Sequence, residues 1–151
     1  MLCRRKSVAD AIERDGLTVF EPDGSVGCYM TVHGCLSGEC PGPVDLAIII
    51  VKASDTATAI EANLNIIGDK TLVMTLQNGG GNDRIIARYV PMERVVIGTT
   101  KHNSVNLDNG NIRHSGSGDT CIGSNVPDAD LSGIVRLFEE AGLATVVSDD
   151  I

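Results

Sequence analysis

The sequence predicts an α/β fold, in which helices cover a parallel sheet and a small antiparallel section is added. Two apolar runs, Val44–Val51 and Thr71–Leu76, read as buried strands and are each followed by residues with helical spacing. A third strand of this series is expected at Arg94–Ile97. This alternation of strands and helices is typical of a parallel sheet with crossover helices. Beyond it, Asp108-Asn109-Gly110 is a strong β-hairpin signal.

Helices are expected over four segments with apolar residues at helical spacing: Val8–Arg14, Asp55–Ile67, Asp83–Tyr89 and Leu131–Glu140. Ser7 and Asp10 form a candidate capping box for the first of these helices, and Asn82 is the expected N-cap of the third. Gly16 and Gly142 are natural stops for the first and last helices. The remaining strand-like segments are Met1–Cys3, Leu17–Phe20, Ser25–Val32, Ser104–Leu107, Asn111–Ser115, Thr120–Ile122 and Ala144–Val147.

Two of these segments flank the hairpin turn, and Thr120–Ile122 is expected to add a third antiparallel strand. Gly34–Pro43 is expected to be a loop. The long run Val44–Val51 has no polar alternation apart from Asp45, so it is expected to be covered on both faces.

Length and composition limit the class of protein. The chain has 151 residues, enough for one domain that buries roughly two-thirds of its unfolded surface. With no Trp, two Tyr and two Phe, its core must be aliphatic. A net charge of −8 argues against nucleic acid or an anionic membrane as a partner but not against a small anionic ligand. No apolar run approaches the roughly 20 residues of a membrane span, and no secretory h-region is found, so a cytoplasmic location is expected.

Cysteines and histidines give no metal-site pattern. The five cysteines are Cys3, Cys28, Cys35, Cys40 and Cys121. Cys35 and Cys40 bracket a Gly/Pro loop and could join in a disulfide or a metal site, but free thiols are expected in a reducing compartment. A structural zinc would need a second close pair of ligands, and only His33 lies near. His33, His102 and His114 have no ligand spacing among them, so no metal is expected.

Lys52 and Asn78 are the first candidates for a ligand site, because each follows a predicted parallel strand. The carboxyl ends of such strands form the ligand crevice of open α/β sheets, where Lys52 could meet a phosphate or carboxylate. Asn78 precedes Gly79-Gly80-Gly81, and consecutive glycines let backbone N–H groups approach a ligand closely. A solvated loop lysine and an ordinary turn asparagine are the alternatives.

Three further residues could contribute to such a site. Arg4 and Arg5 follow the first strand-like residues and would suit a ribose 2′-phosphate, which distinguishes NADP from NAD. Two adjacent arginines also commonly form a solvated face. His102 follows a strand end and could line the crevice, although a structural or solvent-exposed histidine is the alternative.

A series of motifs runs in order along nearly the whole chain: Arg4-Arg5, Gly16-Leu17, Val51-Lys52-Ala53, Leu76-Gln77-Asn78-Gly79, Gly98-Thr99-Thr100 and Asn111-Ile112-Arg113-His114. Each motif is weak alone, but the series at these separations resembles the ketopantoate reductase family (2-dehydropantoate 2-reductases). Members of that family reduce ketopantoate to pantoate with NADPH, in pantothenate and coenzyme A biosynthesis. The resemblance implies a Rossmann-type sheet.

The resemblance also implies a role for individual residues. Arg4 falls on the residue that holds the 2′-phosphate of NADP, with Arg5 as its neighbour. Lys52 falls on a cofactor contact, and Asn78 on a residue that contacts cofactor and substrate. A further cofactor contact is expected near Ser104. The implied substrate is a small 2-keto acid.

The sequence departs from the family pattern in two ways, and both affect the expected domain. The family opens with a strand and a G-x-G-x-x-G loop, a spacing this sequence lacks. The family's general-acid lysine and a ligand-binding glutamate lie in a C-terminal helical domain, beyond Ile151. Residues 1–151 are therefore expected to form a single, partial cofactor-binding domain without the central first strand of the sheet and without any catalytic residue.

The expected function is the NADP-binding part of an oxidoreductase, and the chain alone is expected not to catalyse the reaction. The alternatives are a non-catalytic nucleotide-binding or interaction module, and another NAD(P)-dependent 2-ketoacid reductase. The sequence leaves open which 2-keto acid is used, whether the gene is complete, and the oligomeric state, including a homodimer.

Overall fold

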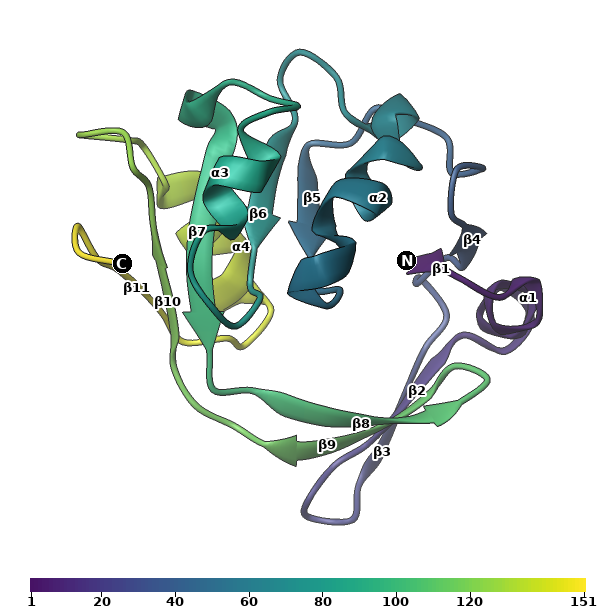
Figure 1. Ribbon diagram of the computed structural model, residues 1–151. Coiled ribbons are helices and arrows are strands. Elements are labelled where there is room, and N and C mark those ends of the chain that lie inside the picture. The colour runs from purple at the N-terminus through teal and green to yellow at the C-terminus, as the bar shows by residue number, and fades with distance from the viewer. The chain divides into compact units, whose positions relative to one another are not determined.

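The computed structural model describes every residue from Met1 to Ile151, and these residues divide into two compact units (Figure 1). Unit 1 consists of Met1–Pro41 and His102–Ser117, and unit 2 consists of Gly42–Lys101 and Gly118–Ile151. Each unit has its own β-structure. None of the helices combines the length and hydropathy that crossing a bilayer requires.

Unit 2 is built on a five-stranded sheet with the order β11-β10-β7-β6-β5. Its strands are β5 (Leu46–Ile49), β6 (Leu72–Thr75), β7 (Val95–Thr100), β10 (Thr120–Gly123) and β11 (Thr145–Val147). Strands β5, β6 and β7 run parallel, whereas β10 is antiparallel to β7 and parallel to β11. The predicted α/β fold with a parallel sheet is therefore confirmed.

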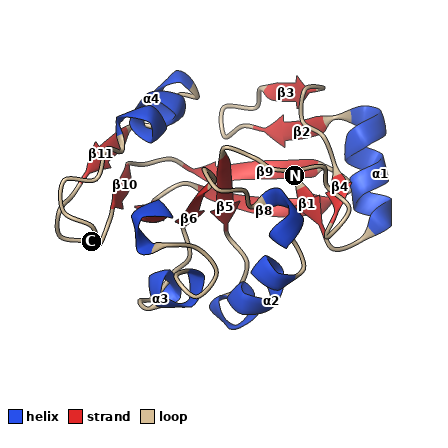
Figure 2. Ribbon diagram, turned by 90° about the horizontal axis from the view of Figure 1, so that it is seen from above, coloured by secondary structure: helices blue, strands red, loops and turns tan.

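Helices cover both faces of this sheet. They are α2 (Thr56–Glu61), α3 (Asn82–Ile86) and α4 (Ser132–Glu140), with single 3₁₀ turns η1 (Ala53–Asp55), η2 (Leu64–Ile66) and η3 (Met92–Arg94). Figure 2 shows α2 and α3 on one side of the strands and α4 on the other. Two helical layers around one sheet explain why the apolar runs of β6 and β7 lack polar alternation.

The core of unit 2 follows from side chains that alternate between the two faces. Val73 packs with Ile60 of α2 and Ile86 of α3, whereas its neighbour Met74 packs with Phe138 of α4. Each such fully buried aliphatic side chain contributes about 1.5–3 kcal/mol relative to its exposure to water. The core is aliphatic, as the composition predicts, and Phe138 is its one buried aromatic residue.

Strand β5 differs from the expectation in its length and position. The predicted strand Val44–Val51 is reduced to Leu46–Ile49, and β5 is an edge strand of the sheet. Ile48 is 44% exposed and Ile50 is 73% exposed, so the prediction that this run is covered on both faces is wrong. The core cluster around α4 includes Leu46 but not Ile48, which explains the exposure.

The predicted crossover helix Asp55–Ile67 is also shorter, because Asn63 interrupts it. Its backbone has φ −132° and ψ 27°, outside the helical region, and its Nδ2 donates to the carbonyl of Ala59 at 2.8 Å. Asn63 is 5% exposed, so this buried hydrogen bond ends α2 and leaves only the separate turn η2 after it. The helix at Asp83–Tyr89 is likewise reduced to α3, and Gly81, not Asn82, is its N-cap.

Unit 1 combines a four-stranded sheet, a two-stranded sheet and one helix. Its elements are β1 (Leu2–Cys3), α1 (Lys6–Asp15), β2 (Leu17–Phe20), β3 (Val26–Tyr29), β4 (Cys35–Leu36), β8 (Asn103–Asp108) and β9 (Asn111–Gly116). The sheet order is β3-β2-β9-β8, with β1 and β4 paired in parallel. Helix α1 buries Ala9 and Ile12 against Cys3.

Unit 1 confirms the hairpin and corrects two details. Strands β8 and β9 form the hairpin, and Gly16 ends α1 with φ 75°. The capping box is not formed, because α1 begins at Lys6 with Arg5 as its N-cap, and Asp10 instead receives Lys6 Nζ at 2.6 Å. The expected loop Gly34–Pro43 contains β4. Finally, β10 is antiparallel as expected, but its partner is β7 of unit 2 and not the hairpin.

Candidate functional site

Lys52 and Asn78 follow neighbouring strand ends in unit 2. Strands β5 and β6 pair in parallel from Leu46–Leu72 to Ile49–Thr75, so the prediction that these two runs lie side by side and point the same way is confirmed. Lys52 comes three residues after β5 and Asn78 three residues after β6, and both residues are exposed. The carboxyl-end rim of β5 and β6 thus carries a cation and an amide next to solvent.

The loops that carry these two residues are joined by Gln77. Its Nε2 donates to the carbonyl oxygen of Val51 at 2.6 Å and to Oγ1 of Thr56 at 2.9 Å. Its Oε1 accepts from Oγ1 of Thr75 at 3.1 Å. Because Val51 precedes Lys52 and Gln77 precedes Asn78, this amide connects the two strand ends directly.

The loop Gly79-Gly80-Gly81 continues the rim after Asn78. Gly79 and Gly81 have φ values of 90° and 89°, in the left-handed region that favours glycine. A Cβ built on any of the three glycines would meet no atom within 4 Å. Asn82, 4% exposed, donates from Nδ2 to the carbonyl of Gly79 at 3.1 Å and so closes the loop. The space around this backbone is open to a ligand.

These groups fit the donor set that a nicotinamide nucleotide requires. A lysine ammonium pairs with phosphate or carboxylate oxygens, and an asparagine side chain can both donate to and accept from a carboxamide. An open glycine backbone allows a planar or charged group to approach closely. When bound, such a cofactor supplies a hydride, and this chain's residues would hold and orient it.

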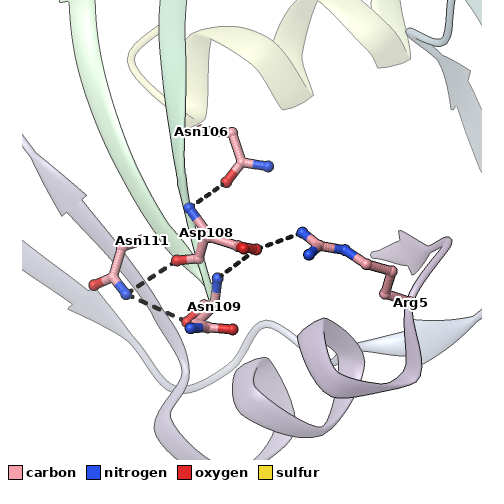
Figure 3. A network of polar contacts seen from close by, with 5 residues as sticks. All are labelled: Arg5, Asn106, Asp108, Asn109 and Asn111. Atoms are coloured by element: carbon pink, nitrogen blue, oxygen red, sulfur yellow. Dashed lines mark hydrogen bonds and ion pairs between the residues drawn. The ribbon is translucent and has the colours of Figure 1, made fainter.

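Arg5, the predicted neighbour of the 2′-phosphate contact, lies in unit 1 and is engaged with the hairpin turn. Its Nη2 lies 2.5 Å from Oδ1 of Asp108, and both side chains remain substantially exposed (Figure 3). Asp108 also receives the backbone N–H of Asn109 at 3.0 Å. The Arg5 guanidinium, followed by this N–H, lowers the pKa of the Asp108 carboxyl. Arg4, its neighbour, is exposed directly after β1.

The turn itself is held by asparagine side chains, as Figure 3 shows. Oδ1 of Asn106 accepts from the N–H of Asp108 at 2.8 Å, and Nδ2 of Asn111 donates to the carbonyls of Asp108 and Asn109. Asp108, Asn109 and Gly110 all have positive φ. Arg5 therefore neutralises a carboxylate of the hairpin turn.

Comparison with known proteins identifies the family. Residues 1–127 match the family model described as ketopantoate reductase PanE/ApbA. The chain belongs to this family. It is 34% identical over 139 residues to the 2-dehydropantoate 2-reductase of Halobacterium salinarum, covering 91% of this chain and 45% of that protein. It is 30% identical over 115 residues to that of Archaeoglobus fulgidus, covering 74% and 37%. The chain thus spans less than half of these curated relatives.

Solved structures agree with the fold. The 2-dehydropantoate 2-reductase of Geobacter metallireducens is 25% identical with a TM-score of 0.80, covering 96% of this chain and 48% of that one. D-mandelate dehydrogenase, solved with NADH and anilino(oxo)acetate, is 25% identical with a TM-score of 0.90, covering 99% and 48%. The Rossmann-like architecture of the N-terminal part of ketopantoate reductases is therefore shared by this chain.

Ser104 and His102, the remaining candidate site residues, lie in unit 1. Ser104 is exposed on β8, opposite His114 of β9. His102 stacks on His114 with ring centroids 5.9 Å apart. Nδ1 of His114 lies 2.6 Å from Oε2 of Glu21, and this contact, followed by one to the carbonyl of Gly116, raises the pKa of His114. The contacts of His102 and His114 are those of structural histidines.

Cysteines and carboxylates form no metal centre. All five cysteines are free thiols, and no group of three or more His, Cys, Asp or Glu residues is placed to hold a metal ion. Burial, followed by the neighbouring thiol of Cys40, raises the pKa of Cys35. A protonated thiol is a weak nucleophile, so the raised pKa disfavours Cys35 as a reactive group.

A cavity of about 450 Å³ lies elsewhere in unit 2, between the loop after β10 and the residues after β11. Its lining includes Asp128 and Asp149 but neither Lys52 nor Asn78. Two carboxylates without a facing cation do not suit an anionic nucleotide. We therefore place the candidate site at the β5–β6 rim.

Sequence reasoning missed the residues that support the rim. Thr56 is fully buried at the start of α2, yet its hydroxyl contacts Gln77, the carbonyl of Ala53 at 2.9 Å and Asn82 at 3.4 Å. The available signal was polarity in two places where apolar residues were expected: a threonine at a helix start and a glutamine closing an apolar strand. The sequence does not show which carbonyl group either side chain contacts.

Proposed function

We propose that this chain binds NADPH and takes part in the reduction of a 2-keto acid, with ketopantoate as the first substrate to test. Membership of the ketopantoate reductase family supports this reaction class. One structural observation supports the site: Lys52 and Asn78 follow adjacent parallel strands beside an open glycine loop. The pathway that this implies is pantothenate and coenzyme A biosynthesis.

In this proposal each rim residue has a distinct task. Lys52 donates hydrogen bonds to an anionic oxygen of the cofactor, and its charge offsets the repulsion from a chain of net charge −8. Asn78 contacts the cofactor and orients the keto acid through its two-sided amide. A bound NADPH would supply the hydride. Arg4 as a 2′-phosphate contact, Arg5 as its neighbour and Ser104 as a cofactor contact stay predictions from the family resemblance.

A calorimetric titration with NADPH tests the proposal. We expect saturable binding that Lys52→Met weakens about 10- to 100-fold, the size of a hydrogen bond between charged groups. Asn78→Ala should weaken binding less, since its contacts are neutral. Lys70→Met is the matched control, because Lys70 is exposed just before the amino end of β6, at the opposite edge of the same sheet. Absence of saturable binding, or equal weakening by Lys70→Met, would contradict the proposal.

A second candidate is a reductase for a different 2-keto acid that uses NADH. The similarity to D-mandelate dehydrogenase, solved with NADH, favours this candidate. Parallel titrations with NADPH and NADH decide between the two cofactors. If the 2′-phosphate is recognised, NADPH binds more tightly and Arg4→Ala removes the preference. Equal affinity for the two cofactors would favour the second candidate.

A further inference from the structure

Gln77 lies just after β6, and its side chain donates a hydrogen bond to the backbone of Val51, the residue before Lys52. Its amide nitrogen has two hydrogens, and both are used: one for Val51 O at 2.6 Å and one for Thr56 Oγ1 at 2.9 Å. Its amide oxygen accepts from Thr75 at 3.1 Å. Both amide hydrogens and the amide oxygen therefore have partners, which hold the side chain in one orientation.

Thr56 extends this connection to the other side of Lys52. A hydroxyl has one hydrogen, and the shortest contact of Thr56 Oγ1 to an acceptor is 2.9 Å to the carbonyl of Ala53. The same oxygen accepts from Gln77, so the chain of bonds runs from Gln77 through Thr56 to Ala53. The carbonyls of Val51 and Ala53, which flank Lys52, are thus both tied to one glutamine.

Burial holds the threonine end of this arrangement in place. Thr56 is 0% exposed and Thr75 is 3% exposed, so their hydroxyls have no water as an alternative partner. Lys52 itself has an extended backbone, φ −60° and ψ 143°, between the strand and η1, and its own carbonyl accepts from Asp55 N at 2.8 Å. The backbone at Lys52 is therefore fixed, although the lysine side chain is exposed.

We propose that Gln77 is a positioning residue that fixes Lys52 relative to β6 and so sets its place toward the cofactor; this inference rests on the proposed function. Gln77 does not touch the ligand in this role. It acts through the carbonyls on either side of Lys52. A residue that served only stability would lower the affinity for NADPH whether or not the lysine was present.

A double-variant cycle separates the two roles. Gln77→Met keeps the side-chain length and removes both donors. In the wild-type background it should weaken NADPH binding about tenfold, near the upper value for one neutral hydrogen bond. In the Lys52→Met background it should weaken binding less than twofold, because the group that it positions is gone. Thr58→Ala, an exposed position on α2, is the control and should have no effect in either background.

Gln77→Glu guards against a folding defect in the first variant. Its carboxylate still accepts from Thr75 but cannot donate to Val51, and its charge repels an anionic cofactor in either background. The weakening is therefore expected in both backgrounds but should be larger when Lys52 is present. Both variants are checked by thermal unfolding before titration. Equal weakening in both backgrounds, or no weakening, overturns the positioning role alone. Failure of the wild-type chain to bind NADPH overturns the proposed function, and this role with it.

Discussion

The shape of the glycine loop can be tested without any ligand, by comparing Gly81→Ala with Gly80→Ala. Gly81 has φ 89°, whereas the φ of Gly80 is not positive. A Cβ at either position meets no atom within 4 Å, so space does not distinguish the two variants. An L-residue in the left-handed region costs about 1–2 kcal/mol. Alanine at an unstrained glycine position is neutral or stabilises by about 0.4–1 kcal/mol.

The two variants should therefore differ by at least about 1 kcal/mol in the free energy of unfolding of unit 2. With a urea m-value of about 2 kcal/mol/M, this corresponds to a difference in midpoint of about 0.5 M. The chain has two tyrosines, Tyr29 in unit 1 and Tyr89 in unit 2. In a Tyr29→Phe background, the fluorescence of Tyr89 reports on unit 2 alone.

Equal midpoints for the two alanine variants, or a greater loss with Gly80→Ala, would refute the loop geometry. Gly79→Ala provides an independent repeat, since Gly79 has φ 90° and an equally open surrounding. It should resemble Gly81→Ala. A loop whose three glycines respond alike would not present the backbone as described.

Two further predictions concern pH. Because Glu21 raises the pKa of His114 in the folded state, the stabilisation from this pair should be complete below about pH 6.5 and should be lost as the pH rises through the raised pKa. Glu21→Gln should return the NMR-measured pKa of His114 toward its ordinary value; an unchanged pKa would contradict the assigned cause. Because Arg5 lowers the pKa of Asp108, the stabilisation from that pair should be present above about pH 3.9 and should be lost as the pH falls through the lowered pKa. Arg5→Met should raise the pKa of Asp108, measured by carbon NMR, whereas Arg4→Met should leave it unchanged.

The fold was largely predictable because its determinants are local. The apolar run at Thr71–Leu76, the helical spacing at Leu131–Glu140 and the Asp-Asn-Gly turn each specify an element from neighbouring residues alone. The exposure of Ile48 was not predictable, because it depends on which strand lies at the edge and on how far α4 extends. The edge strand β5 (Leu46–Ile49) is as apolar as the internal strand β6 (Leu72–Thr75).

The candidate site was likewise predictable only in part. Lys52 and Asn78 could be paired from the sequence, because neighbouring βαβ strands end at one rim. The connection through Gln77 and Thr56 could not, because it joins residues 21 to 26 positions apart through carbonyl groups that every residue has. The ion pair of Arg5 with Asp108, 103 residues away, was hidden for the same reason.

Mapping of NADP⁺ onto the nitrogen-15-labelled chain by NMR tests most directly whether the β5–β6 rim is the cofactor site. We predict that the largest amide shift changes in unit 2 fall on Lys52–Ala53 and Asn78–Gly81, and that Lys52→Met reduces them at the same ligand concentration. Shift changes confined to the loop after β10 and the residues after β11, with the rim unchanged, would contradict this account.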